Sequence, residues 1–71
     1  FKVHYNRGKN HLLCERTEQA VADFDKAVSL KPEHAKAHEL FGDALSRSGK
    51  EEEAAIHWAI AETLREKRKG R

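Results

Sequence analysis

The fold is decided by AVADFDKAVSL at residues 20–30, which returns 34 residues later as AAIHWAIAETL at residues 54–64. The same interval separates Gly8 from Gly42. Self-similarity of this period is typical of helical repeats, in which a pair of helices cannot bury its apolar face alone. We therefore expect an all-α chain made of one helical hairpin written twice. Such an array presents the rest of its surface for binding.

Start and stop signals divide the chain into four helices with short connections. Pro32 disfavours helical geometry at the residue before it and ends the second helix. Gly49 supplies a left-handed cap for the third helix, and Thr17 is placed to cap the second. The acidic run at residues 51–53 favours the start of the fourth helix. The expected helices cover residues 2–14, 17–31, 34–48 and 51–67. Connections this short favour antiparallel neighbours, so the first helix packs on the second and the third on the fourth.

Two glycines mark close contacts expected inside the hairpins. A glycine within a helix costs about 1 kcal/mol relative to alanine, which is tolerable where another helix must approach closely. We expect Gly8 to face the small side chain of Ala20. In the second hairpin we expect Gly42 to face Ala54.

Larger side chains indicate the cores of the hairpins. Phe24 in the first hairpin and Trp58 in the second are expected to supply most of the buried volume. The single cysteine, Cys14, stands in the apolar run of residues 12–14 and is expected to be a small buried side chain. A chain of 71 residues lies near the lower limit for a hydrophobic core, so we expect its stability to depend on assembly.

The composition argues against several classes of protein. No apolar stretch approaches the roughly 20 residues that span a bilayer, and no charged-then-apolar leader precedes Phe1. The compartment is left undetermined by the sequence, with the cytoplasm favoured. His34 and His38 have a one-turn spacing, but a structural zinc site needs four ligands, usually with cysteine. The sequence contains neither a phosphate-binding loop nor a recognisable triad or carboxylate pair. We expect no metal, no cofactor and no enzymatic activity.

These features together resemble the tetratricopeptide repeat, whose signature is W-x₂-L-G-x₂-Y, then A-x₃-F, then P. The matching residues are Gly8, Ala20, Phe24 and Pro32 in the first repeat and Gly42, Ala54 and Trp58 in the second. The departures include His4, Arg7 and His11 in the first repeat and His38 and Glu66 in the second. The resemblance covers essentially the whole chain. It implies one domain, residues 1–71, with repeats at 1–34 and 35–68 and a basic tail at 65–71.

The family resemblance also implies a right-handed superhelical stack with a concave groove that receives a peptide or helix of a partner. By position, the groove would present Lys2, Tyr5, Lys9, Leu12, Lys36, Glu39, Asp43 and Ser46. The charges on that surface are mixed in sign, and the alternative for each side chain is an ordinary solvated helix face. Some family members grip the C-terminal carboxylate of chaperones with a Lys-and-Asn clamp. The matching places here hold Tyr5, Lys9 and Leu40, which disfavours that ligand.

The fourth predicted helix has an apolar face that the second lacks. Ile56, Ala59 and Ile60 stand where the first repeat has Ala22, Asp25 and Lys26. The helix becomes apolar nearly all round, which is typical of burial on both sides. An exposed apolar patch is expected to be covered by a third hairpin or capping helix, a second copy of the chain, or a different subunit. The alternative is that these side chains pack on the third helix.

The last seven residues hold five cations and one carboxylate, although the whole chain has a net charge of only +2. The cations are Arg65, Lys67, Arg68, Lys69 and Arg71. Such a tail suits nucleic acid, anionic lipid or an acidic protein, but cations also stabilise a helix C-terminus. The rest of the chain carries no basic stripe, which disfavours nucleic acid.

We therefore expect a protein–protein interaction module, an adaptor or assembly scaffold, that binds a peptide or helix and self-associates through its last helix. Binding of nucleic acid or an anionic surface through the tail is the alternative. The partner, the oligomeric state and membership of a longer repeat array are left open by the sequence.

Overall fold

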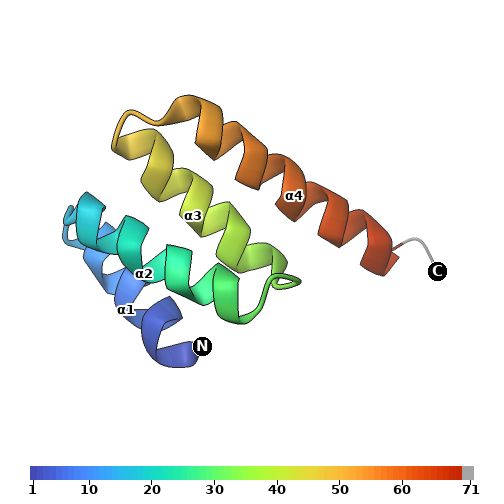
Figure 1. Ribbon diagram of the computed structural model, residues 1–71, viewed down its shortest axis with the longest axis horizontal. Helices are drawn as coiled ribbons and strands as arrows, with labels where there is room; N and C mark the ends of the chain where they lie inside the picture. Colours follow the sequence, from blue (N-terminus) through green and yellow to red (C-terminus); the bar gives the residue numbers. More distant parts are fainter. Residues whose placement is uncertain (70–71) are drawn as a thin grey trace.

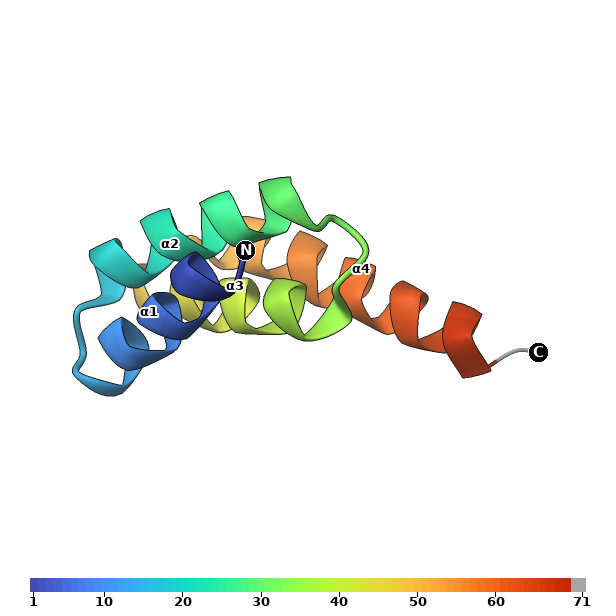
Figure 2. The ribbon, with the colours of Figure 1, turned by 90° about the horizontal axis from the view of Figure 1, so that it is seen from below.

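The computed structural model describes residues 1–69, with side chains up to Lys67, and the described residues form four helices without a strand. The helices are α1 (Lys2–Leu13), α2 (Thr17–Leu30), α3 (Ala35–Arg47) and α4 (Glu51–Lys69). They form two antiparallel hairpins, α1 with α2 and α3 with α4, and α2 packs against α3 (Figure 1). Figure 2 shows α1 and α3 on one side of the molecule with α2 above them. The predicted all-α repeat fold is confirmed.

The two hairpins turn in the same way at the end of their first helix. Gly49 has the expected left-handed conformation, with φ of 89°, and Lys50 N donates to Leu45 O at 2.8 Å. The equivalent residue of the first hairpin is Glu15, which also has a positive φ, 61°. Arg16 N donates to His11 O at 2.7 Å just after it. The two turns are therefore alike, although only one of them has a glycine.

Two helix starts differ in how they are capped. His34 precedes α3, and its Nδ1 accepts a hydrogen bond from Ala37 N at 3.1 Å. The prediction that Thr17 caps α2 is wrong, because Thr17 is the first helical residue. The cap position is held by Arg16, whose side chain makes no capping hydrogen bond. The helix therefore begins one residue earlier than a Thr17 cap requires, and its cap residue Arg16 directly follows the left-handed residue Glu15.

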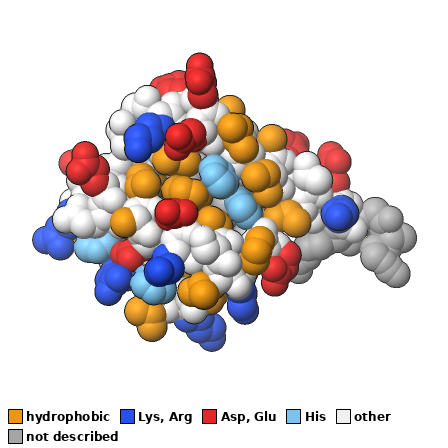
Figure 3. All heavy atoms as spheres, viewed as in Figure 1, with side chains coloured by type: hydrophobic (Ala, Val, Ile, Leu, Met, Phe, Trp, Pro, Cys, Tyr) orange, Lys and Arg blue, Asp and Glu red, His pale blue; other side chains and the backbone are white. Residues whose placement is uncertain are grey.

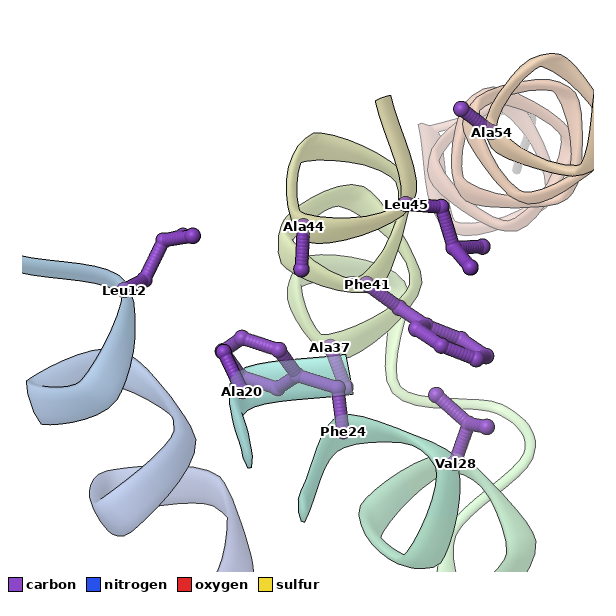
Figure 4. Packing of buried hydrophobic residues seen from close by; sticks show 9 residues of the cluster. All are labelled: Leu12, Ala20, Phe24, Val28, Ala37, Phe41, Ala44, Leu45 and Ala54. Atoms are coloured by element: carbon purple, nitrogen blue, oxygen red, sulfur yellow. The ribbon is translucent and has the colours of Figure 1, made fainter. Parts of the chain in front are cut away.

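The core lies where α2 meets α1 and α3. In Figure 4 the ring of Phe24 lies between α1 and α3, and Phe41 and Val28 point toward one another. Phe24 is fully buried, as predicted. The cluster consists of Leu12, Ala20, Phe24, Val28, Ala37, Phe41, Ala44, Leu45 and Ala54. All four helices contribute to this cluster, so the two hairpins share a single core.

The predicted role of Trp58 as a core residue is wrong. Its side chain is 39% exposed, because α3 packs against it on one side only. Phe24, at the equivalent position, is covered by both α1 and α3. The indole Nε1 of Trp58 donates to Asp43 Oδ1 at 3.1 Å and to Glu39 O at 3.3 Å. Trp58 therefore links α4 to α3 by hydrogen bonds at the edge of the core.

The two helical glycines, Gly8 and Gly42, lie closest to aromatic rings, although we expected them to face alanines. A Cβ added to Gly8 would lie 2.9 Å from Cε1 of Phe24. A Cβ added to Gly42 would lie 2.5 Å from Nε1 of Trp58. The nearest neighbours of the two glycines are therefore the rings of Phe24 and Trp58, and not Ala20 and Ala54 as expected.

Cys14 is exposed, so the prediction that it is a buried hydrophobe is wrong. Leu12 takes the buried position at this end of α1, while Leu13 is 82% exposed. Successive residues of a helix point in directions about 100° apart, so neighbours in an apolar run cannot all face one core. Cys14 also lies beyond the last helical residue.

The departures from the repeat signature in the first hairpin form a polar network around Asp23. The guanidinium of Arg7 donates to both carboxylate oxygens of this buried residue, at 3.0 and 2.9 Å. His4 Nδ1 lies 3.5 Å from Oδ1, and His11 Nε2 lies 3.6 Å from Oδ2. The hydrogen bonds from Arg7 hold the pKa of Asp23 below its usual value, against the effect of burial. Polar side chains at signature positions are therefore paired with one carboxylate.

Candidate protein-binding groove

Tyr5 lies at the centre of an aromatic group that joins α1 to the start of α3. Its ring stacks on Phe1 with centroids 5.2 Å apart, and meets Phe24 and His34 edge-on at 6.4 and 5.2 Å. Lys9 Nζ lies 5.1 Å from the Tyr5 centroid, within the range of a cation–π contact. Burial raises the pKa of Tyr5, with a further contribution from Glu39. Tyr5 is thus half-buried and held in place by its neighbours.

A pocket of about 340 Å³ opens between α1 and α3. Its lining consists of Lys9, Leu12, Leu13, Glu15, Leu40 and Arg47. Of the two leucines from α1, Leu12 is buried and Leu13 is exposed. The rim carries two cations and one carboxylate. Among the predicted groove residues, Lys9 and Leu12 therefore meet in one pocket, and Leu40 joins them from α3.

The two predicted carboxylates of the groove are bound to other parts of the molecule. Glu39 pairs with Arg65 of α4, and its Oε1 lies 3.5 Å from Lys36 Nζ. The hydrogen bond from Arg65 lowers the pKa of Glu39, although burial opposes it. Asp43 accepts the hydrogen bond from Trp58 Nε1. Both carboxylates thus position α4 on α3.

The remaining predicted groove residues lie on the exposed side of the hairpins. Lys2 stands at the start of α1, and Lys36 in the first turn of α3, where it is paired with Glu39. Lys2 and Lys36 hold the same position in the two repeats. Cations on this face therefore also lie outside the pocket, Lys2 on α1 and Lys36 on α3.

Ile56, Ala59 and Ile60 lie away from the groove, along α4. Together with Thr63, Leu64 and Lys67 they line a second pocket of about 410 Å³. Figure 3 shows hydrophobic side chains gathered along α4 on the face that also carries α2. The alternative that these side chains pack on α3 fails for Ile56, which is 58% exposed.

A histidine pair that sequence reasoning missed joins α3 to α4. His38 Nε2 donates to Pro32 O at 2.7 Å, which leaves the Nδ1 of neutral His38 as an acceptor. His57 Nδ1 lies 3.0 Å from His38 Nδ1 and is therefore the donor, with the rings stacked at 5.3 Å. Burial lowers the pKa of His57, and repulsion from His38 lowers it further when the His38 ring is protonated. The signal in the sequence is His57 at the position that Asp23 occupies in the first repeat.

Neither histidine of the predicted one-turn pair is placed for a metal. His34 caps α3, and His38 bonds Pro32 and His57. Up to Lys67, no three His, Cys, Asp or Glu side chains gather in a metal-binding arrangement. Across the same described residues, no helix combines the length and apolar character needed to cross a membrane.

The basic tail is only partly described. Arg65 is bound to Glu39, and Lys67 lines the pocket along α4. The side chains of Arg68 and Lys69, and the whole of Arg71, lie outside the described residues. Of the two tail cations whose side chains are described, Arg65 thus contacts α3 and Lys67 lies beside the pocket on α4.

Comparison with known sequences decides the family of the first hairpin. A family profile described as "Tetratricopeptide repeat" matches residues 1–34, which contain α1, α2 and the turn after them. The first hairpin of the chain is a tetratricopeptide repeat. In this family the fold serves interaction between proteins, so the match indicates a protein-interaction module.

The chain is also similar to part of a curated protein. The chain is 46% identical over 35 residues to the mitochondrial import receptor subunit TOM70 of Homo sapiens. This stretch is 49% of the chain but only 6% of the human protein. The chain therefore spans a small fraction of the length of that relative.

Proposed function

We propose that the chain binds an extended or helical segment of a partner protein along the face formed by α1 and α3. In this proposal, an apolar side chain of the partner enters the pocket between Leu12 and Leu40, and an acidic residue of the partner lies near Lys9 and Arg47. The single observation that carries the proposal is that pocket, an apolar hollow whose lining includes two cations, Lys9 and Arg47, and one carboxylate, Glu15. Concave apolar sites with a few polar groups are the usual form of binding sites.

The preference for an acidic segment is supported by the way charges on this face are used. Glu39 and Asp43 are engaged with α4, whereas Lys2 and Lys9 are exposed. Exposed cations steer acidic partners and raise their rate of association. The relative named as an import receptor subunit agrees with a receptor-like role, since receptors act by binding other proteins.

The test is to select peptides from a random display library on the 71-residue chain. The proposal expects enriched peptides with an apolar residue flanked by Asp or Glu, and NMR shift changes centred on Lys9, Leu40 and Arg47. A Leu40→Asp variant should lose binding. Lys26→Ala, on the exposed side of α2, is the control and should bind as the unmodified chain does. Shift changes confined to α4 would overturn the proposal.

A further inference from the structure

The apolar strip of α4 is defined as Ile56, Ala59, Ile60, Thr63 and Leu64, with Lys67 at its end. Ile56 is the most exposed of its large side chains, and Ile60 and Leu64 are half-buried. The pocket along the strip is lined by residues of α4 alone. An apolar row of this kind on a helix is typical of an interaction surface.

A further repeat stacked in the way α3 stacks on α2 would leave the strip uncovered. A shift of 34 residues places Val21, Phe24 and Val28, which pack in the core, at Ala55, Trp58 and Glu62. The strip corresponds instead to Ala22, Asp25, Lys26, Ser29 and Leu30, which are all exposed although α2 lies between α1 and α3. The occupant of the strip is therefore something other than the next repeat in register.

The charges on α4 indicate what that occupant is. The helix begins with Glu51, Glu52 and Glu53 and carries Lys67 near its other end, so its two ends have opposite charge. Ile60 is the central residue of α4. At 100° per residue, Glu53, Ile56, Ile60, Leu64 and Lys67 share one side of the helix.

We propose that two copies of the chain pair through α4 in antiparallel orientation, around a twofold axis at Ile60. This register places Ile60 against its own copy and Ile56 against Leu64. It also places Glu53 against Lys67 at both ends, so each end joins opposite charges. A twofold interface uses the same surface on both subunits, which the symmetry of this row about Ile60 satisfies.

The first test measures association of the 71-residue chain by sedimentation equilibrium across the micromolar to millimolar range. A monomer–dimer equilibrium is expected, and Ile60→Lys should weaken it by about a hundredfold, because two cations would meet at the axis. Glu62→Lys makes a charged change on the side of α4 away from the strip and is the control. A chain that stays monomeric throughout this range overturns the proposal. That result would leave a segment of a longer protein as the occupant of the strip.

The register is tested by charge exchange. Glu53→Lys and Lys67→Glu should each weaken the dimer by about tenfold, because each turns two attractive pairs into repulsive ones. The double variant should restore the affinity. Circular dichroism confirms that each variant is folded. Two single changes whose effects simply add in the double variant would overturn this register.

Cysteine cross-linking tests the orientation, in a Cys14→Ser background because Cys14 is exposed. Ile60→Cys should form a disulfide-linked dimer, and so should Ile56→Cys mixed with Leu64→Cys. Ile56→Cys alone should not, because in the antiparallel pair its two copies lie about 12 Å apart along the axis, beyond disulfide reach. Efficient cross-linking of Ile56→Cys with itself would indicate parallel helices and overturn the proposal.

Discussion

Glu15 and Gly49 occupy the same position in the two hairpins, and both have a left-handed backbone, with φ of 61° and 89°. A residue with a Cβ is strained there by about 1 to 2 kcal/mol, whereas glycine is not. The first hairpin therefore carries strain that the second avoids.

Glu15→Gly is expected to stabilise the chain by about 1 kcal/mol, because it removes that strain. Gly49→Ala should destabilise it by a similar amount, although nothing lies within 4 Å of the added Cβ. Urea unfolding followed by circular dichroism measures both. A loss of stability in Glu15→Gly would show that the side chain of Glu15 stabilises the turn by more than its backbone costs.

Gly8→Ala is expected to destabilise the chain more than Gly42→Ala, although the added Cβ approaches its ring more closely at Gly42. Phe24 is fully buried and has nowhere to move, so overpacking there costs about 1 to 3 kcal/mol. Trp58 is partly exposed and can swing outward. The comparison is made by thermal unfolding of the two variants, and equal losses would contradict it.

Asp23→Asn is expected to destabilise the chain at neutral pH by about 1 to 3 kcal/mol, because Arg7 loses a charged hydrogen-bond acceptor. The folded pKa of Asp23 is lowered, so its contribution is present above the ordinary value of 3.8 and is lost as the pH falls through the folded pKa. Urea unfolding at neutral and at strongly acid pH should therefore show a difference that shrinks in acid. Asp25→Asn, on the exposed side of α2, is the matched control and should have little effect.

His57 is expected to make the chain less stable in mild acid. Its folded pKa lies below the ordinary 6.5, so the neutral form is favoured on folding and this stability is lost as the pH falls below 6.5. The neighbouring carboxylates of Glu53 and Asp25 oppose the shift, and burial outweighs them. His57→Gln keeps a donor for His38 without titrating, and its melting temperature should decline less between neutral pH and mild acid. If the melting temperature of His57→Gln declines as much as that of the unmodified chain, groups other than His57 cause the loss of stability.

Charge reversal on the groove rim should weaken an acidic peptide selected on the chain. Lys9→Glu and Arg47→Glu are each expected to cost roughly tenfold in affinity at low salt, and less at high salt, where surface charges are screened. Fluorescence anisotropy of the labelled peptide measures this. Lys26→Glu makes the same change on the exposed side of α2, and an equal loss in that variant would point to net charge instead of the groove.

Sequence periodicity predicted the elements of the fold and missed contacts that depend on neighbours in space. The helix ends at Pro32 and Gly49 follow from local backbone chemistry, and the four helices are confirmed. Trp58 copies the position of Phe24 but lacks a third helix over its ring, so the repeat pattern overstated its burial. Asp23 was passed over because its partners Arg7 and His11 are separated from it in sequence and meet it only in the folded hairpin.

The candidate site was less accessible to sequence reasoning than the fold. Position within the repeat placed Lys9 and Leu12 on the first helix, and they do meet in one pocket. It could not show that Glu39 and Asp43 are bound to Arg65 and Trp58, because those contacts depend on side chains of a different helix. Charge on a helix face is therefore a poor guide to which charges are available to a ligand.

Trp58 is the one tryptophan of the chain, and its indole lies at the molecular edge, half in contact with water. Its fluorescence is consequently a built-in optical reporter for this end of the protein. Emission should move to shorter wavelength when a neighbouring repeat or another protein dries the ring, and to longer wavelength when α4 separates from α3. No label is needed to follow either event in real time.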